Sequence, residues 1–289
     1  MPVVETSAGP IEYTDTGGDG PVLVFLHGLL MNETVWRKVI PALSDEYRCV
    51  LPVLPLGGHR VPMRPDADLS LAALGRLVGE LLDRLDLSGV TLVQNDWGGV
   101  QVLLALGDAS RVARLVVTSS EAFENYPPAP ARPIVAAARI PGGLALLMQA
   151  LRLTAMRRAP GGWGWMSKRP IPKEVLDDWF RPARTDPAIR RDLAKYVVSV
   201  PSRATLLDWA GRSAGFGGPV LVAWAAEDRM MPVEHGRRLA ALFAGGRLIE
   251  IADSYTLIAE DQPEQLASAM LAFLRETATE AERSGSAPG

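Results

Sequence analysis

The stretch that decides the fold is V-T-L-V-Q-N-D-W-G-G-V-Q-V-L-L-A, residues 90–105. Its first part is a short apolar, β-branched run typical of a buried parallel strand, and from Gly98 onward apolar residues recur at helical spacing. Asp96 therefore lies at the apex of a sharp strand-to-helix turn, which is the geometry of a nucleophile elbow. The usual elbow pattern is G-x-S-x-G, whereas here Gln94 stands first and an aspartate replaces the serine. Gly98 supplies the glycine that the closely passing helix backbone requires.

Strand and helix patterns alternate on both sides of this turn. A first hairpin is expected within residues 2–16. Short apolar runs of strand character recur along the chain, at 22–26, 48–54, 114–118, 219–225 and 247–251. Amphipathic runs of helical character lie between and after them, at 70–85, 234–243 and 263–275. This alternation predicts an α/β fold with a mainly parallel central sheet flanked by helices.

Residues 121–215 interrupt this pattern. They contain no run of convincing strand period, and they carry clustered prolines and several large aromatic residues. We expect this segment to be a helical cap inserted over the carboxyl edge of a core built from 1–120 and 216–275. The polar residues 276–289 are expected to form a disordered tail.

Composition narrows the class of protein. A net charge of −3 gives no reason to expect a nucleic-acid partner, and the single cysteine, Cys49, excludes an internal disulfide. No apolar run is long enough to span a membrane, so no membrane partner is expected. Residues 1–6 lack the features of a secretion signal, so we expect a cytoplasmic protein. No cluster of His, Cys and carboxylate residues has the spacing of metal ligands, so no metal or cofactor is expected. The sequence leaves open whether the chain forms a homodimer.

Four features occur in a fixed order along the chain. They are His27-Gly28 after a strand, Asp96 at the elbow, the cap segment, and Asp228 in A-W-A-A-E-D-R after the penultimate strand. Together they resemble the α/β-hydrolase superfamily over about residues 2–275. The sequence N-D-W-G-G is similar to the aspartate-nucleophile branch, which contains haloalkane dehalogenases and epoxide hydrolases. The resemblance implies an α/β-hydrolase fold with a helical cap.

An aspartate at the elbow has a specific chemistry. It is ionised at neutral pH and can displace a halide or open an epoxide directly, which leaves an alkyl ester on the enzyme. In the family a histidine, oriented by an acid, activates the water that hydrolyses this ester. The resemblance also implies that the backbone N–H groups of Trp97 and Leu29 form the oxyanion hole, and that the Trp97 indole donates to the departing halide.

The family's catalytic histidine is missing from its usual place. It normally lies in a turn after the last strand, as G-H-x-x-x-E-x-x-P, but here that turn reads D-S-Y-T-L-I-A-E-D-Q-P. Thr256, or Tyr255 if the register slips, stands where the histidine should be. Loss of the base should spare the first half-reaction and slow ester hydrolysis, because only the second step needs an activated water.

Other histidines are candidates for the missing role. His59 lies in a loop at the carboxyl edge of the sheet, where it is either a relocated base or substrate contact, or simply a loop histidine bonded to backbone. We expect His27 to support the oxyanion loop beside Gly28 and not to act in the chemistry.

The acid is ambiguous too. Asp228 fits the position after the penultimate strand, and Glu121 fits an alternative acid position used by some dehalogenases. Either residue can instead cap a helix or pair with an arginine. Asp96 also has a plainer interpretation, as an aspartate that tolerates a strained turn.

The leading hypothesis is a haloalkane-dehalogenase-like hydrolase that attacks a small apolar substrate through Asp96. An epoxide or ester hydrolase is one alternative. The other is a non-hydrolytic member, a lyase, cyclase or binding protein, which the absent histidine favours. Leu29 replaces an asparagine common in dehalogenases, and Leu30 replaces a proline common in epoxide hydrolases, so neither substrate is specified.

Overall fold

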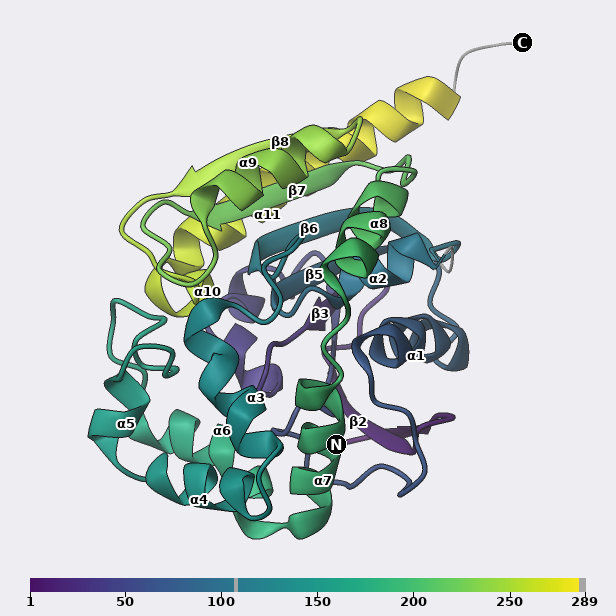
Figure 1. Cartoon of the computed structure of the whole chain (residues 1–289). Coiled ribbons are helices and arrows are strands. Elements are labelled where there is room, and N and C mark those ends of the chain that lie inside the picture. The colour runs from purple at the N-terminus through teal and green to yellow at the C-terminus, as the bar shows by residue number, and fades with distance from the viewer. Residues whose placement is uncertain (107–108, 286–289) are drawn as a thin grey trace.

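The computed structural model describes residues 1–106 and 109–285 and shows a central eight-stranded sheet between layers of helices (Figure 1). The strand order is β1-β2-β4-β3-β5-β6-β7-β8, and all pairings from β4 to β8 are parallel. An antiparallel hairpin of β1 and β2 forms one edge. The strands are β1 (Val3–Glu5), β2 (Pro10–Asp15), β3 (Val22–Leu26), β4 (Arg48–Pro52), β5 (Val90–Asp96), β6 (Val112–Ser120), β7 (Val220–Ala225) and β8 (Gly246–Ile251). The predicted α/β fold with a mainly parallel sheet is confirmed.

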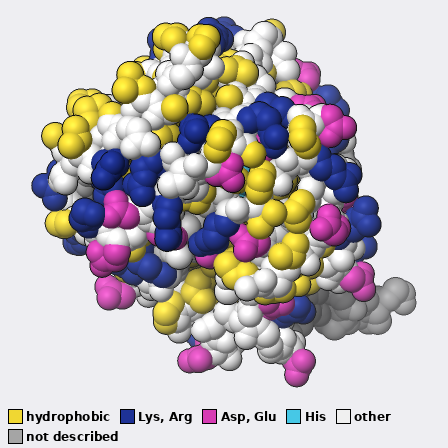
Figure 2. All heavy atoms as spheres, turned by 90° about the horizontal axis from the view of Figure 1, so that it is seen from below, with side chains coloured by type: hydrophobic (Ala, Val, Ile, Leu, Met, Phe, Trp, Pro, Cys, Tyr) yellow, Lys and Arg dark blue, Asp and Glu magenta, His cyan; other side chains and the backbone are white. Residues whose placement is uncertain are grey.

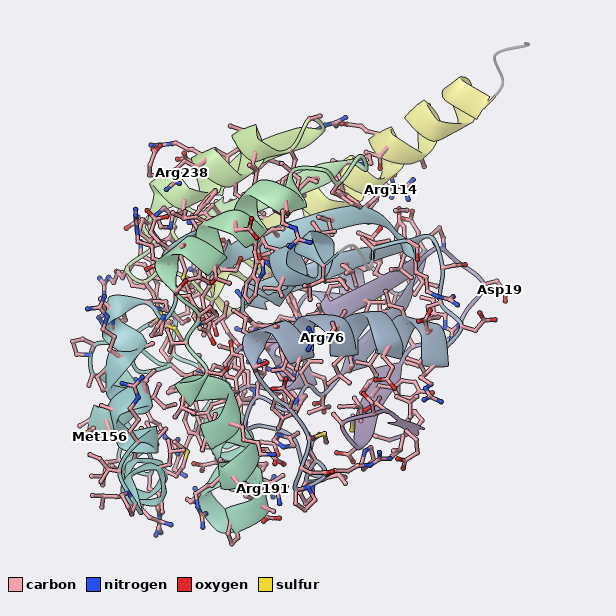
Figure 3. The ribbon with its side chains drawn as sticks, turned by 45° about the vertical axis from the view of Figure 1, so that its right-hand side comes forward. Asp19, Arg76, Arg114, Met156, Arg191 and Arg238 are labelled. Carbon is pink, nitrogen blue, oxygen red and sulfur yellow. The ribbon has the colours of Figure 1, made fainter. Side chains whose placement is uncertain are left out.

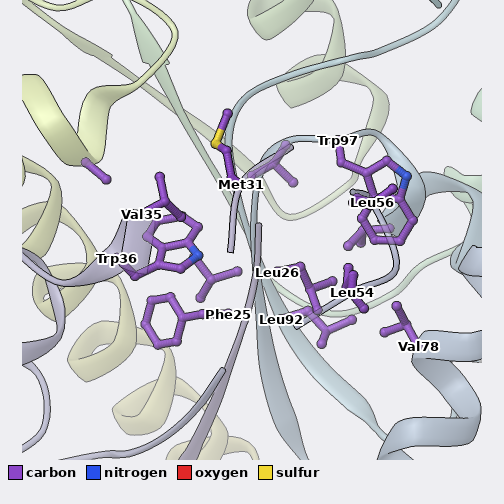
Figure 4. Packing of buried hydrophobic residues seen from close by; sticks show 14 of the residues in the cluster. Phe25, Leu26, Met31, Val35, Trp36, Leu54, Leu56, Val78, Leu92 and Trp97 are labelled. Atoms are coloured by element: carbon purple, nitrogen blue, oxygen red, sulfur yellow. The ribbon is translucent and has the colours of Figure 1, made fainter. Parts of the chain in front are cut away.

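Helices cover both faces of this sheet. They are η1 (Glu33–Trp36), η2 (Ile40–Ala42), α1 (Leu71–Arg84), α2 (Gly99–Ala105), α8 (Arg203–Ser213), α9 (Val233–Leu242), α10 (Ile258–Asp261) and α11 (Pro263–Gly285). On one face α2 packs between α1 and α8, and on the other η1 contacts α10. Figure 4 shows Phe25 and Trp36 on one side of the sheet and Leu54 and Val78 on the other, so both faces carry a buried core.

Local sequence explains why these elements form. Every residue of β5 is buried, as expected for a central parallel strand covered on both faces. The helix α1 begins where predicted, because the Ser70 hydroxyl accepts a hydrogen bond from the Ala73 N–H at 3.2 Å. The elbow thus lies near the centre of the sheet, at the carboxyl end of a strand whose residues are all buried.

The helical insertion lies between β6 and β7. Its elements are η3 (Ala129–Ala131), α3 (Arg132–Ala138), α4 (Gly143–Ala150), α5 (Thr154–Arg158), α6 (Lys173–Thr185) and α7 (Pro187–Val198). In Figure 1 these helices form a separate layer at one end of the sheet. The helix α8 differs from the expectation of a cap running to residue 215, because its buried Leu206 and Ala210 face the core and α8 packs on α2.

The C-terminal segment also differs from its expectation. The helix α11 continues to Gly285, so residues 276–285 are helical and not disordered; residues 286–289 lie outside the described part of the chain. The Thr277 side chain anchors this extension, because it is buried and accepts a hydrogen bond from Arg114 Nε at 2.8 Å. Among the described helices, none is both long and apolar enough to cross a bilayer.

Candidate active site

Asp96 ends β5 at the apex of the elbow, with a left-handed backbone conformation of φ 62°. Its carbonyl oxygen accepts a hydrogen bond from the Glu121 N–H at 2.9 Å, which holds the turn against the end of β6. A Cβ atom at Gly28 would lie 2.2 Å from Asp96 Oδ2, and one at Gly98 would lie 2.6 Å from the Glu121 carbonyl oxygen. Both glycines are therefore required for the backbone to approach this closely.

The Asp96 carboxylate is held by the loop after β3. The Leu29 N–H donates a hydrogen bond to Asp96 Oδ2 at 3.0 Å. The Trp97 N–H, the other expected oxyanion donor, instead bonds to the Asn95 carbonyl oxygen at 2.6 Å within the elbow itself. In this structure one of the two expected donors reaches the carboxylate.

His27 holds the loop after β3 through hydrogen bonds to the backbone. Its Nε2 accepts a hydrogen bond from the Leu54 N–H at 2.8 Å, so its Nδ1 carries the proton and donates to the Gly28 carbonyl oxygen at 2.9 Å. Complete burial lowers its pKa to about 4, which keeps the ring neutral. His27 thus ties the His-Gly loop to the end of β4 and has no nitrogen left for chemistry.

The Trp97 indole folds back against the helix that follows it. A Cβ atom at Gly99 would lie 1.9 Å from the indole Cζ2, so the ring occupies the space that this glycine leaves. The side chain is buried, and its Nε1 has no hydrogen-bond partner among the described residues. Trp97 is absent from the residues that line the cavity next to Asp96.

That cavity has a volume of about 220 Å³ and lies between Asp96 and the cap. Its other lining residues include Leu29 and Met230 from the core, and mostly apolar side chains from residues 130–166 of the cap. Trp163 Nε1 donates to the Leu29 carbonyl oxygen at 2.8 Å, which ties the cap to the loop that holds the carboxylate. Asp96 is the charged residue among those lining the cavity. The site thus presents one carboxylate to a small apolar space.

Burial changes the protonation of this carboxylate. Desolvation by burial raises the pKa of Asp96 to about 6. The hydrogen bond from the Leu29 N–H lowers this pKa, and the negative charge of Asp228 raises it by a smaller amount. The group is still mainly ionised at neutral pH. A desolvated carboxylate that stays ionised is a stronger nucleophile than one in water.

Asp228 lies close to this site and is hydrogen-bonded to Thr256, the residue that the sequence predicts at the position of the family's histidine. The Thr256 hydroxyl donates to Asp228 Oδ1 at 2.7 Å, and the N–H groups of Met230 and Met231 donate to the same oxygen. Thr256 is fully buried, whereas the Tyr255 hydroxyl accepts a hydrogen bond from Arg229 near the surface. The register therefore places Thr256, and not Tyr255, against the acid.

His59 is held away from the cavity. Its Nδ1 accepts a hydrogen bond from the Gly57 N–H at 3.2 Å, and its Nε2 lies 3.3 Å from Asp192 Oδ2 in α7. Burial lowers its pKa in spite of this carboxylate. Both ring nitrogens are engaged, and His59 does not line the cavity, so this contact joins the loop to the cap.

Glu121 is the one alternative acid that the structure brings next to the elbow. Burial, with the negative charge of Asp96, raises its pKa well above its ordinary value, which favours the protonated form. Its Oε2 is enclosed and has no hydrogen-bond partner in the described part of the chain.

Residues 1–106 and 109–285 contain no group of three His, Cys, Asp or Glu side chains that could hold a metal ion.

Comparison with known proteins agrees with this geometry. The model of the alpha/beta hydrolase fold family matches residues 21–263, which span the elbow, the cap and Asp228. The chain belongs to the α/β-hydrolase fold family.

Relatives of this α/β-hydrolase include dehalogenases. It is 27% identical to haloalkane dehalogenase 2 of Mycobacterium tuberculosis over 92% of both chains. It is 35% identical to a cis-3-alkyl-4-alkyloxetan-2-one decarboxylase of Xanthomonas campestris over 42% of this chain and 43% of that protein. A solved alpha/beta hydrolase fold protein from Burkholderia ambifaria superposes with a TM-score of 0.76, at 26% identity, over 94% of this chain and 97% of its own. The α/β-hydrolase is thus dehalogenase-like.

Sequence reasoning missed two residues that shape the site, Asp192 and Asn95. It expected the cap tryptophans, Trp163 among them, to line either an apolar pocket or the core of the cap, but it gave no partner for the Trp163 indole. Asp192 and Trp163 make their contacts across more than a hundred positions of sequence, and no local pattern indicates either contact. Asn95 was passed over as part of the elbow, although its Nδ2 donates to the Thr256 carbonyl oxygen at 3.2 Å. The signal for Asn95 was a polar side chain in a strand whose residues are all buried, because such a side chain needs a hydrogen-bond partner.

Proposed function

We propose that this α/β-hydrolase attacks a saturated carbon of a small apolar substrate with the Asp96 carboxylate, in the manner of a haloalkane dehalogenase. The observation that carries the proposal is the hydrogen bond from the Leu29 N–H to Asp96 Oδ2 at the base of the apolar cavity. It fixes one oxygen as the future carbonyl oxygen of the ester. Oδ1 has no partner among the described residues and is the attacking atom.

The first step needs no proton transfer. Oδ1 forms a bond to the carbon, the carbon–halogen bond breaks, and the halide leaves with the bonding electron pair. The apolar cap favours an alkyl substrate.

The second step lacks its usual base. Hydrolysis of the ester requires a water that loses a proton as it attacks the carboxyl carbon. Thr256 stands beside Asp228 where the family has histidine, and its hydroxyl already donates to that carboxylate. None of the chain's histidines, His27, His59 and His235, lines the cavity. We therefore expect the ester to hydrolyse slowly.

The absence of a histidine from the cavity lining favours a second candidate function, a lyase reaction. In a four-membered lactone of the kind that the Xanthomonas relative's name describes, Oδ1 would attack the saturated ring carbon that is bonded to the ring oxygen, and the bond between that carbon and the oxygen would break to leave a carboxylate on the neighbouring carbon. Loss of carbon dioxide would then form the alkene, as its electron pair expels the Asp96 carboxylate. The nucleophile is regenerated without water or base.

A time course of product release tests both functions. With bromoalkanes we expect a burst of one bromide per chain followed by slow release, and no burst from Asp96→Asn. With a small alkyl-substituted β-lactone, steady formation of alkene and carbon dioxide would favour the lyase. Steady bromide release without a burst would contradict a slow second step, and no bromide, alkene or carbon dioxide would contradict attack by Asp96.

A further inference from the structure

The cap carries an unusual distribution of charge. Residues 125–172 contain seven arginines and lysines and no aspartate or glutamate, although the whole chain has a net charge of −3. Four of the arginines are exposed and make no ion pair with any described residue. They are Arg132, Arg139, Arg152 and Arg158. They lie in α3, in α5 and in the turns that follow α3 and α4, and we refer to residues 132–158 as the cationic face of the cap.

The same face exposes large apolar side chains. Leu146 is 74% exposed, Leu153 and Ile140 are each 61% exposed, and Met156 is 38% exposed. These are half of the described large hydrophobic residues that are exposed, and they fall within residues 140–156. Figure 2, which views the molecule from the cap side, shows hydrophobic and cationic side chains next to one another, with acidic side chains of other segments among them. Isolated exposed leucines are ordinary, whereas a cluster marks a contact surface.

We propose that this face of the cap, residues 132–158, binds the surface of an anionic phospholipid membrane. Arginines without acidic partners are attracted to anionic headgroups, and the leucines and Met156 can enter the boundary between headgroups and acyl chains. Such attachment needs no membrane-spanning run, so it is compatible with the absence of one in the sequence. A nucleic acid would use the arginines but would leave the aliphatic side chains in water.

The position of the cavity connects membrane attachment with access of substrate to Asp96. Met156 and Leu147 line the cavity next to Asp96, and Met156 is also part of the exposed cluster. Figure 3 shows Met156 at the outer edge of the cap. An apolar substrate dissolved in a bilayer would thus reach the cavity without crossing water. This step rests on the proposed function, whereas membrane binding does not.

Flotation of the full chain with lipid vesicles tests the binding. We expect the wild type to float with vesicles of phosphatidylcholine and phosphatidylglycerol, much less with phosphatidylcholine alone, and less in high salt. Arg139→Glu/Arg152→Glu should weaken binding by about fivefold for each cation lost. Leu146→Asp/Leu153→Asp should weaken it by about tenfold for each leucine.

Matched variants on other surfaces are the controls. Arg76→Glu/Arg84→Glu reverses two charges on α1, away from the cap (Figure 3), and Val3→Asp replaces an apolar residue that is 51% exposed in β1. Both should float like the wild type. Equal loss in controls and cap variants would overturn the proposal, as would no flotation with anionic vesicles. A wild-type dimer that Leu146→Asp/Leu153→Asp converts to a monomer, with no vesicle binding, would also overturn it by assigning the face to a second copy.

Discussion

The hydroxyl of Thr256 donates a hydrogen bond to the carboxylate of Asp228 at 2.7 Å. The sequence predicts that Thr256 stands at the position of the family's histidine, and since a hydroxyl is not a base at neutral pH, Thr256 can hold the turn but cannot act as that base. Asp96, in contrast, keeps its glycines, its Leu29 donor and its apolar cavity. We therefore propose that the site supports nucleophilic attack by Asp96 but hydrolyses the resulting ester slowly.

Restoring the histidine should complete the cycle. Thr256→His places an imidazole beside Asp228, and we expect it to accelerate breakdown of the Asp96 ester by about 10²- to 10⁴-fold while the first bromide burst stays similar. Single-turnover mass spectrometry of the alkylated protein measures the breakdown. Thr256→Val, which keeps the shape and removes the hydroxyl, is the control and should leave breakdown as slow as in the wild type. An ester equally long-lived in Thr256→His would show that the base is not what is missing.

The rate of alkylation should depend on the ionisation of Asp96. Its raised pKa of about 6 means that the attacking form is lost as the pH falls below that value. The burst rate should be nearly constant above about pH 7 and fall about tenfold per pH unit below about pH 5. Stopped-flow detection of bromide release measures it. A rate that stays constant down to pH 4.5 would place the nucleophile elsewhere.

The same pKa has a consequence for stability. A carboxyl group whose pKa is raised in the folded state binds more protons there than in the unfolded chain, so stability falls as the pH rises from about 4 to about 6. Asp96→Asn removes this penalty and should raise the free energy of unfolding at pH 7 by up to about 3 kcal/mol. Urea unfolding at pH 7 and pH 4 measures the difference, which should disappear at pH 4. A less stable Asp96→Asn at pH 7 would contradict this.

The elbow and its first partners could be predicted from sequence, because their signals are local. Gly28, Asp96 and Gly98 each occupy a fixed place beside a strand end, and the structure shows why two of them must be glycine. The contact between His59 and Asp192 could not be predicted, because a lone histidine in a loop gives no sign of which distant helix supplies its partner. Likewise, the polar residues after Arg275 gave no sign that Thr277 would anchor a longer helix.

The close approach of Gly28 to the Asp96 carboxylate should be essential for alkylation of Asp96. In Gly28→Ala the new Cβ would collide with Asp96 Oδ2, so the carboxylate must move away from the Leu29 N–H. We expect the alkylation rate to fall by about 10²-fold. Gly211→Ala in α8 is the matched control, because a Cβ there meets no atom within 4 Å, and it should react like the wild type. Equal rates in both variants would show that the Leu29 contact does not position the nucleophile.

His59 should contribute to stability more than to chemistry. His59→Ala breaks the contacts with Gly57 and Asp192 and leaves a buried carboxylate less well paired, which should lower the free energy of unfolding by about 2 kcal/mol. The bromide burst should be unchanged, and so should the slow phase. Loss of the slow phase alone in His59→Ala would instead identify His59 as the base.

We propose that Asp96 forms a covalent ester that this chain hydrolyses slowly. The decisive experiment is the intact mass of the protein after incubation with a bromoalkane, followed by peptide mapping. We predict one added alkyl group per chain, located on Asp96 and absent from Asp96→Asn. An unmodified wild-type protein that nevertheless releases alcohol and bromide steadily, or an alkyl group on any other residue, would contradict the account.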